Sequence, residues 1–73
     1  MNPEAVPIAL QSSLLSSAAY SDDGTLQLQF HNGAIYQYFA VPIGVFQDLL
    51  AAQSKGSYFN RYIRDQFHHQ RLA

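Results

Sequence analysis

The chain has 73 residues, no cysteine and a formal net charge of −1, which excludes disulfide cross-links, thiolate metal sites and a general attraction to polyanions. This length forms one small domain, which we expect over residues 8–73 after a flexible N-terminal arm over residues 1–7. No apolar stretch approaches the ~18 residues of a membrane span, and no basic segment starts a secretory signal, so we expect a cytoplasmic protein.

The charges are unevenly distributed along the chain. Residues 1–54 contain acidic side chains and no Lys or Arg. The basic side chains all follow, and they are Lys55, Arg61, Arg64 and Arg71, accompanied by one carboxylate at Asp65. Only the C-terminal part of the chain can therefore attract an anion.

Alternation of polar and apolar residues predicts three strands. Residues 15–20 alternate and end at the turn cluster of residues 21–24. Residues 25–30 form the clearest strand, because two leucines and a phenylalanine occupy one face and Thr and Gln the other. A third strand is expected over residues 34–39.

The Asn32-Gly33 turn decides which face of the third strand carries Tyr36 and Tyr38. A two-residue turn would place both tyrosines on the polar face and would bury Gln37. If Gly33 is instead a left-handed bulge residue, both tyrosines pair with leucines on the core face. We favour this second register, because a buried amide without a partner costs roughly 1–3 kcal/mol.

Two helices are predicted after the sheet. Val41-Pro42 ends the third strand, and the spacing of apolar residues predicts a helix over residues 42–53. Gly56 is expected to stop this helix, and Ser57 to be the N-cap of a second helix over residues 58–68. The predicted fold is α+β, a three-stranded antiparallel β-meander followed by two α-helices packed on one face.

An ordered set of residues runs along most of the chain: Ser12-Ser13, Leu15, Ser17, Tyr20, Leu26, Phe30, Asn32-Gly33, Tyr36, Tyr38, Val41-Pro42, Phe46, Leu49, Ser54, Gly56, Phe59-Asn60 and Ile63. Over residues 10–68 this set resembles the KTSC domain family; one departure is Ala18, where the family tends to carry a bulky aliphatic residue. We expect a structural role for the motif residues Asn32, Gly33, Tyr36, Tyr38, Pro42, Ser54, Phe59 and Asn60.

The resemblance implies a small stand-alone bacterial protein whose domain also occurs at the C-terminus of some lysyl-tRNA synthetases. The molecular function of the family is not established, and RNA binding is a suggestion from the synthetase context. The resemblance implies no catalytic residues.

One candidate anion site lies where the predicted helices meet. Lys55, Gly56 and Ser57 open the second helix, whose free N–H groups and dipole favour a phosphate, and Arg61 and Arg64 follow on later turns. The same stretch is also explained as a joint with a capping glycine and a capping serine. We prefer the joint, and both interpretations can hold together.

No metal, cofactor or catalytic site is predicted. His68 and His69 are adjacent, so on a helix end their side chains would point about 100° apart and would not share a metal ion. No Ser, His and Asp are spaced as a nucleophile, a base and an orienting acid. We therefore expect that the protein is not an enzyme.

The resemblance suggests a weak accessory module that binds RNA, either tRNA or a single strand, through the start of the second helix. Even if all four basic side chains met phosphates, the slope of log affinity against log salt would be only about −3. The alternative is a protein-interaction or homodimerisation module that covers the exposed sheet face beside Ile35 and Phe39.

Overall fold

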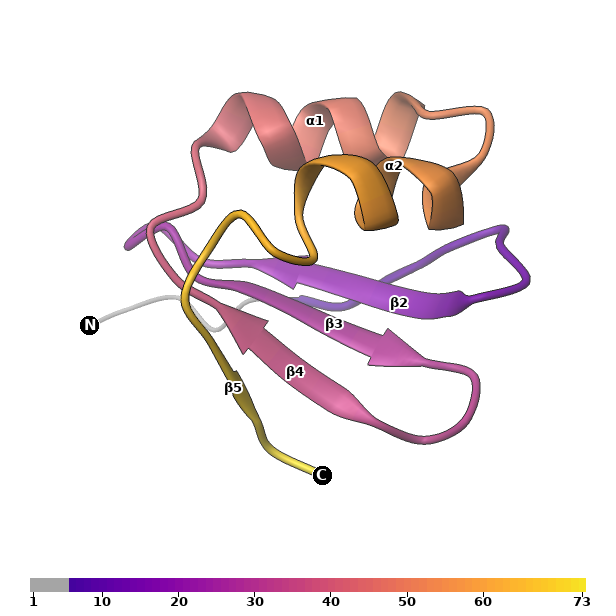
Figure 1. Cartoon of the computed structure of the whole chain (residues 1–73), viewed down its shortest axis with the longest axis horizontal. Helices are drawn as coiled ribbons and strands as arrows, with labels where there is room; N and C mark the ends of the chain where they lie inside the picture. Colours follow the sequence, from indigo (N-terminus) through magenta and orange to yellow (C-terminus); the bar gives the residue numbers. More distant parts are fainter. Residues whose placement is uncertain (1–5) are drawn as a thin grey trace.

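The computed structural model describes residues 6–73, which form an antiparallel sheet with two helices on one face (Figure 1). The strands, in their order across the sheet, are β1 (Ile8–Ala9), β2 (Leu15–Tyr20), β3 (Leu26–Phe30), β4 (Ile35–Tyr38) and β5 (His69–Arg71). The helices are α1 (Ile43–Ala51) and α2 (Lys55–Tyr62). The α+β class and the three central strands are confirmed, but the sheet has two more strands than predicted. Most of the predicted arm, residues 1–5, lies outside the described residues.

The two additional strands lie at the edges of the sheet, where β1 pairs with β2 and β5 pairs with β4. They contain two and three residues, which is too short to show the alternation that identifies a strand. All residues of both strands are exposed. Their place in the sheet therefore depends on backbone pairing and not on a buried face.

The predicted second helix over residues 58–68 is wrong at both ends. The helix ends at Tyr62, because the Ile63 and Arg64 N–H groups both donate to the Phe59 carbonyl oxygen, at 3.0 and 2.9 Å, and close the last turn. The chain then reverses, and the His68 carbonyl accepts from the Phe39 N–H at 2.9 Å just before β5. The two histidines, which we expected at a helix end, therefore lie at the start of an edge strand, with His68 directly before β5 and His69 as its first residue.

The start of α2 also differs from the prediction. The Ser54 side chain accepts from the Ser57 N–H at 3.3 Å, so Ser54 is the N-cap and not Ser57. Gly56 does not stop α1 but lies in the first turn of α2, where an added Cβ would be 3.4 Å from the Leu14 Cβ. The Ser54 hydroxyl offers a cap three residues earlier than predicted, and the helix begins there.

The predicted register between β3 and β4 is confirmed. Gly33 has φ 91°, its N–H donates to the Phe30 carbonyl at 3.0 Å, and the Phe30 N–H donates to the Ala34 carbonyl at 2.9 Å. This is a turn with a left-handed bulge glycine. The cross-strand pairs are Leu28↔Tyr36, Leu26↔Tyr38 and, on the opposite face, Gln27↔Gln37.

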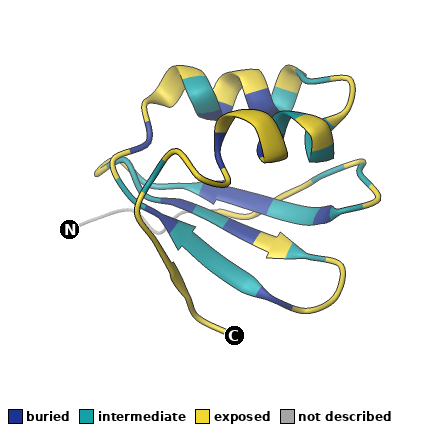
Figure 2. Cartoon of the chain, viewed as in Figure 1, coloured by how far each residue is buried: buried dark blue, intermediate teal, exposed yellow. Residues whose placement is uncertain are grey.

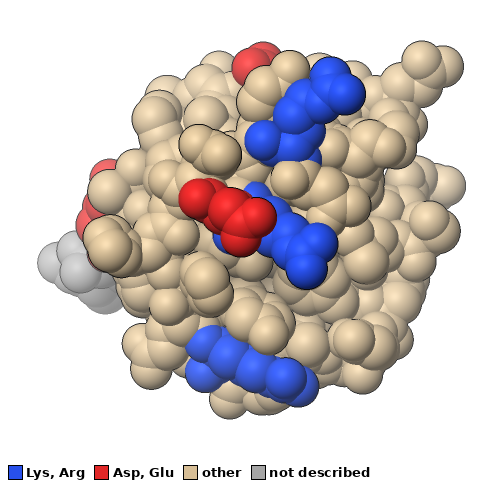
Figure 3. Space-filling model, viewed as in Figure 1, with Lys and Arg blue, Asp and Glu red and all other residues tan. Residues whose placement is uncertain are grey.

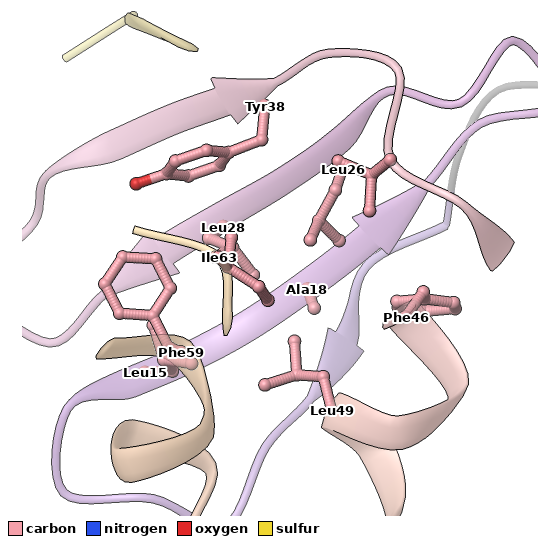
Figure 4. Close-up of a cluster of buried hydrophobic side chains, with 10 residues drawn as sticks. Leu15, Ala18, Leu26, Leu28, Tyr38, Phe46, Leu49, Phe59 and Ile63 are labelled. Atoms are coloured by element: carbon pink, nitrogen blue, oxygen red, sulfur yellow. The ribbon is translucent and has the colours of Figure 1, made fainter. Parts of the chain in front are cut away.

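The hydrophobic core lies between the helices and the covered face of the sheet (Figure 2). Alternation along β2 predicted Leu15 and Ala18 on opposite faces, but both are buried, because the register shifts between Leu15 and Ser17. Figure 4 shows Ala18 opposite Leu49 of α1. The small side chain of Ala18 leaves room for the fully buried Leu49.

Candidate ligand groove

A groove of about 440 Å³ opens between the C-terminal end of α2 and the β3–β5 side of the sheet. The groove borders the hydrophobic core, because two core side chains, Tyr38 and Phe59, also line it. The side chains that line the groove fall into two groups, an aromatic floor and a polar rim.

The aromatic floor contains both motif tyrosines. Tyr36 meets Phe30 edge to face, with ring centroids 5.8 Å apart, and Tyr38 meets Phe59 in the same way at 5.8 Å. The His69 ring of β5 lies beside both tyrosines, with its centroid 5.8 Å from Tyr36 and 5.4 Å from Tyr38. Five rings therefore come together from three strands and a helix.

The two tyrosines differ in their exposure. Tyr38 is 3% exposed and belongs to the core, as Figure 4 shows, whereas Tyr36 is half-buried and faces the open groove. Burial raises the pKa of Tyr38 to about 12, with a smaller contribution from Tyr36, while Arg64 acts in the opposite direction. The Tyr38 hydroxyl is therefore protonated at neutral pH and can donate a hydrogen bond.

The polar rim comes from two sides of the groove. Arg71 of β5 lies over the Tyr36 ring, with its guanidinium carbon 5.7 Å from the ring centroid, and its Nε donates to the Ala73 carbonyl at 2.8 Å. Asn60, Arg64 and Asp65 line the groove from the end of α2. Figure 3 shows basic side chains over the α2 region and over the β5 edge, with one acidic side chain among them.

The residues predicted for phosphate binding are mostly elsewhere. Of the five, Arg64 alone lines the groove. The Lys55 ammonium donates to the Ala52 carbonyl at 2.9 Å, and the Ser57 N–H donates to the Ser54 cap. Several donors at the start of α2 therefore already have partners inside the protein, while Arg61 is exposed on α2.

The motif residues, which we expected to be structural, divide into two sets. Gly33, Pro42 and Ser54 shape a turn and the starts of the two helices. The others line the groove: Asn32, Tyr36, Tyr38, Phe59 and Asn60. Asn32 also has a structural role, because its side-chain oxygen accepts from the Ala34 N–H at 2.9 Å.

His69 and Arg71 were not predicted as site residues, because His69 was expected at a helix end and no strand was expected after it. Their two-residue spacing, which puts both on one face of a strand, was the available signal. Among residues 6–73, no group of three or more His, Asp or Glu side chains is placed to hold a metal ion. None of the helices formed by these residues is long and apolar enough to cross a membrane.

Comparison with known proteins gives consistent matches. The KTSC domain family matches residues 11–67. A lysine–tRNA ligase from Nostoc sp. is 47% identical over 49 residues, which are 67% of this chain and 9% of the ligase. The chain thus spans about a tenth of the length of the ligases that it matches.

Two smaller proteins match over more of their length. An uncharacterized protein from Stutzerimonas stutzeri is 45% identical over 60 residues, which are 81% of this chain and 84% of that protein. The crystal structure of a KTSC domain protein from Yersinia pestis superposes with a TM-score of 0.90 and 30% identity, covering 96% of this chain and all of that chain.

Proposed function

Because this chain belongs to the KTSC domain family, we propose that it is a small non-enzymatic module that binds single-stranded RNA weakly, with one unpaired nucleotide in the groove. The observation that carries this proposal is the meeting of an aromatic floor with two arginines, Arg64 and Arg71, at one groove. Single-stranded RNA is bound by stacking of bases on aromatic rings and by contacts of basic side chains with phosphates.

The groove provides a surface for each part of a nucleotide. The half-buried Tyr36 and the neighbouring His69 offer ring surfaces to a base, and a stacked base contributes about 1–3 kcal/mol. Arg71, which lies above Tyr36, and Arg64 on the opposite side are placed to meet the flanking phosphates. A volume of about 440 Å³ suits one nucleotide rather than a duplex.

Two phosphate contacts make the expected binding weak. Each contact with a single strand changes the slope of log affinity against log salt by about −0.7, which gives about −1.4 for two arginines. A dissociation constant on the order of 10⁻⁴ M at physiological salt is expected from so few contacts. Such affinity fits an accessory module, and the lysine–tRNA ligases that share this domain are named for a reaction on RNA.

An NMR titration of the ¹⁵N-labelled chain with a short unstructured RNA, at low and high salt, tests the proposal. The expected shifts are in the amides of β4, β5 and residues 59–65, and they shrink as salt rises. Arg64→Ala should weaken binding several-fold and reduce the salt slope by about 0.7. Arg61→Ala removes the same charge from α2 outside the groove and should change little.

Two results would contradict this location. Shifts confined to residues 55–57 and 61 would return the contact to the start of α2, as the sequence predicted. No shifts at low salt would remove the RNA proposal altogether.

Self-association is a second candidate, favoured by the sheet face that neither α1 nor α2 covers (Figure 1). Half-buried Ile35 lies on this face together with Gln27 and Gln37, whose amides are hydrogen-bonded to each other at 3.3 Å. A dimer that covers this face would add the apolar burial that a small domain lacks. Sedimentation equilibrium at increasing concentration tests it, and Ile35→Lys should abolish any dimer that is found.

A further inference from the structure

We infer that the groove selects guanine over the other bases, and that Asp65 and Asn60 are the residues that read it. The inference rests on the proposed function and adds the identity of the base. It is carried by the chemistry of two polar side chains that line the groove, a carboxylate that repels phosphate and an amide that can both donate and accept a hydrogen bond.

The end of α2 places both side chains at the rim. Asn60 lies in the last turn of the helix, directly after the buried Phe59. The Phe59 carbonyl then accepts from two successive N–H groups, and the Gln66 N–H donates to the Ile63 carbonyl at 3.1 Å. These tight turns bring Asp65 back to the groove that Asn60 lines.

Neither polar group has a structural use that explains it. Both residues are exposed, and no side-chain hydrogen bond within residues 6–73 involves the Asn60 amide or the Asp65 carboxylate. Asparagine is also a weaker helix former than alanine at such a position. Both groups are therefore available to a ligand in the groove.

A carboxylate in a nucleotide site repels phosphate and instead accepts hydrogen bonds from base N–H groups. On the Watson–Crick edge, guanine presents two adjacent donors, N1–H and N2–H₂, which match the two oxygens of one carboxylate. Adenine and cytosine place an acceptor beside their amino group, and uracil has its single N–H between two carbonyls. Asp65 therefore favours guanine.

The Asn60 amide completes the recognition. Guanine carries the acceptors O6 and N7, and an amide NH₂ can donate to either of them. Arg64 and Arg71 supply positive charge at the same groove for the flanking phosphates. The carboxylate and the amide thus bind the base, and the guanidinium groups bind the phosphate backbone.

The test uses five RNA pentamers, UUNUU, in which N is guanosine, adenosine, cytidine, uridine or xanthosine. The full chain is titrated with each pentamer and followed by NMR. The guanosine pentamer should bind about tenfold more tightly than those with the other three standard bases. Asn60→Ala should reduce this preference several-fold, whereas Arg61→Ala should leave it unchanged.

Asp65→Asn is the more specific test, because it replaces one hydrogen-bond acceptor of the side chain by a donor without changing the shape of the side chain. Xanthine carries a carbonyl where guanine carries N2–H₂, so the amide of this variant complements xanthine. The variant should lose the guanosine preference and bind the xanthosine pentamer at least about fivefold more tightly than the parent chain does. Such a gain cannot result from poor folding.

The outcomes separate the inference from the proposed function. Equal binding of the four standard pentamers, or an unchanged preference in Asp65→Asn, overturns the guanine inference and leaves RNA binding in place. No binding of any pentamer at low salt overturns both.

Discussion

Tyr36 and Tyr38 stand two residues apart on one face of one strand and both line the groove, yet only Tyr38 belongs to the buried core. Tyr38 lies under the end of α2 and packs into the core with Leu26, whereas Tyr36 lies where the helical layer stops and the groove begins. A tyrosine side chain therefore stabilises the core at position 38, whereas at position 36 it can contact a ligand in the groove. A sequence motif therefore does not by itself determine what each of its residues does. The role of each tyrosine depends on whether the helices cover it.

The largest expected difference in stability is between the alanine variants of the two tyrosines. Tyr38→Ala is expected to lower the free energy of unfolding by about 3 kcal/mol, because a buried aromatic ring leaves a cavity. Tyr36→Ala should cost about 1 kcal/mol, because half of the ring surface already meets solvent. Urea denaturation measures both, and equal losses would contradict the distinction.

The pH dependence of stability is a second test of the burial of Tyr38. The pKa of Tyr38 is raised to about 12 in the folded protein, chiefly by burial, and is about 10 in the unfolded chain. The unfolded chain therefore loses this proton first, so the stabilisation is complete below about pH 10 and is lost between about pH 10 and about pH 12, by at most about 3 kcal/mol.

Urea denaturation across this pH range follows the loss, and Tyr38→Phe is the control. The phenylalanine variant cannot ionise at this position and should lose less stability over the same range. An identical decline in both proteins would show that the decline has another source.

Two glycines test the backbone that presents the tyrosines. Gly33 has φ 91°, so Gly33→Ala should destabilise the protein by about 1–2 kcal/mol through strain in the turn. Gly56 lies in the first turn of α2, so Gly56→Ala should be neutral or stabilise by up to about 1 kcal/mol. Thermal unfolding compares them, and a clear loss at position 56 would indicate that contact with Leu14 outweighs helix propensity.

The smallest expected effect on stability concerns the start of α2, the helix that lies between the core and the groove. Ser54→Ala should cost about 1 kcal/mol, because the helix loses its N-cap. Ser57→Ala should cost less, since the backbone N–H of residue 57 keeps its partner. The reverse order in urea denaturation would restore Ser57 as the cap.

Much of the fold followed from local patterns. The Leu-Gln alternation of β3 and the Asn32-Gly33 turn predicted the register of β3 and β4, because only one register keeps the glutamines out of the core. Val41-Pro42 predicted where the sheet gives way to α1. The bulge in β2 escaped prediction, since it changes which residues face inward without leaving a turn signal.

The groove was predicted only in part. Tyr36, Tyr38, Phe59 and Asn60 were recognised as a motif, but residues far apart in the chain had to meet before they formed a site. His69 and Arg71 were missed because β5 is short and exposed, and its position depends on pairing with β4.

By itself, the sequence determined the α+β class, the face that carries the tyrosines and the position of the basic residues near the C-terminus. These features depend on side-chain periodicity and turn chemistry, which act over a few neighbouring residues. Only the tertiary structure decided that α2 stops at Tyr62, that β5 returns to the sheet, and that a groove opens between them. These features depend on backbone hydrogen bonds and packing between distant segments, which no local pattern records.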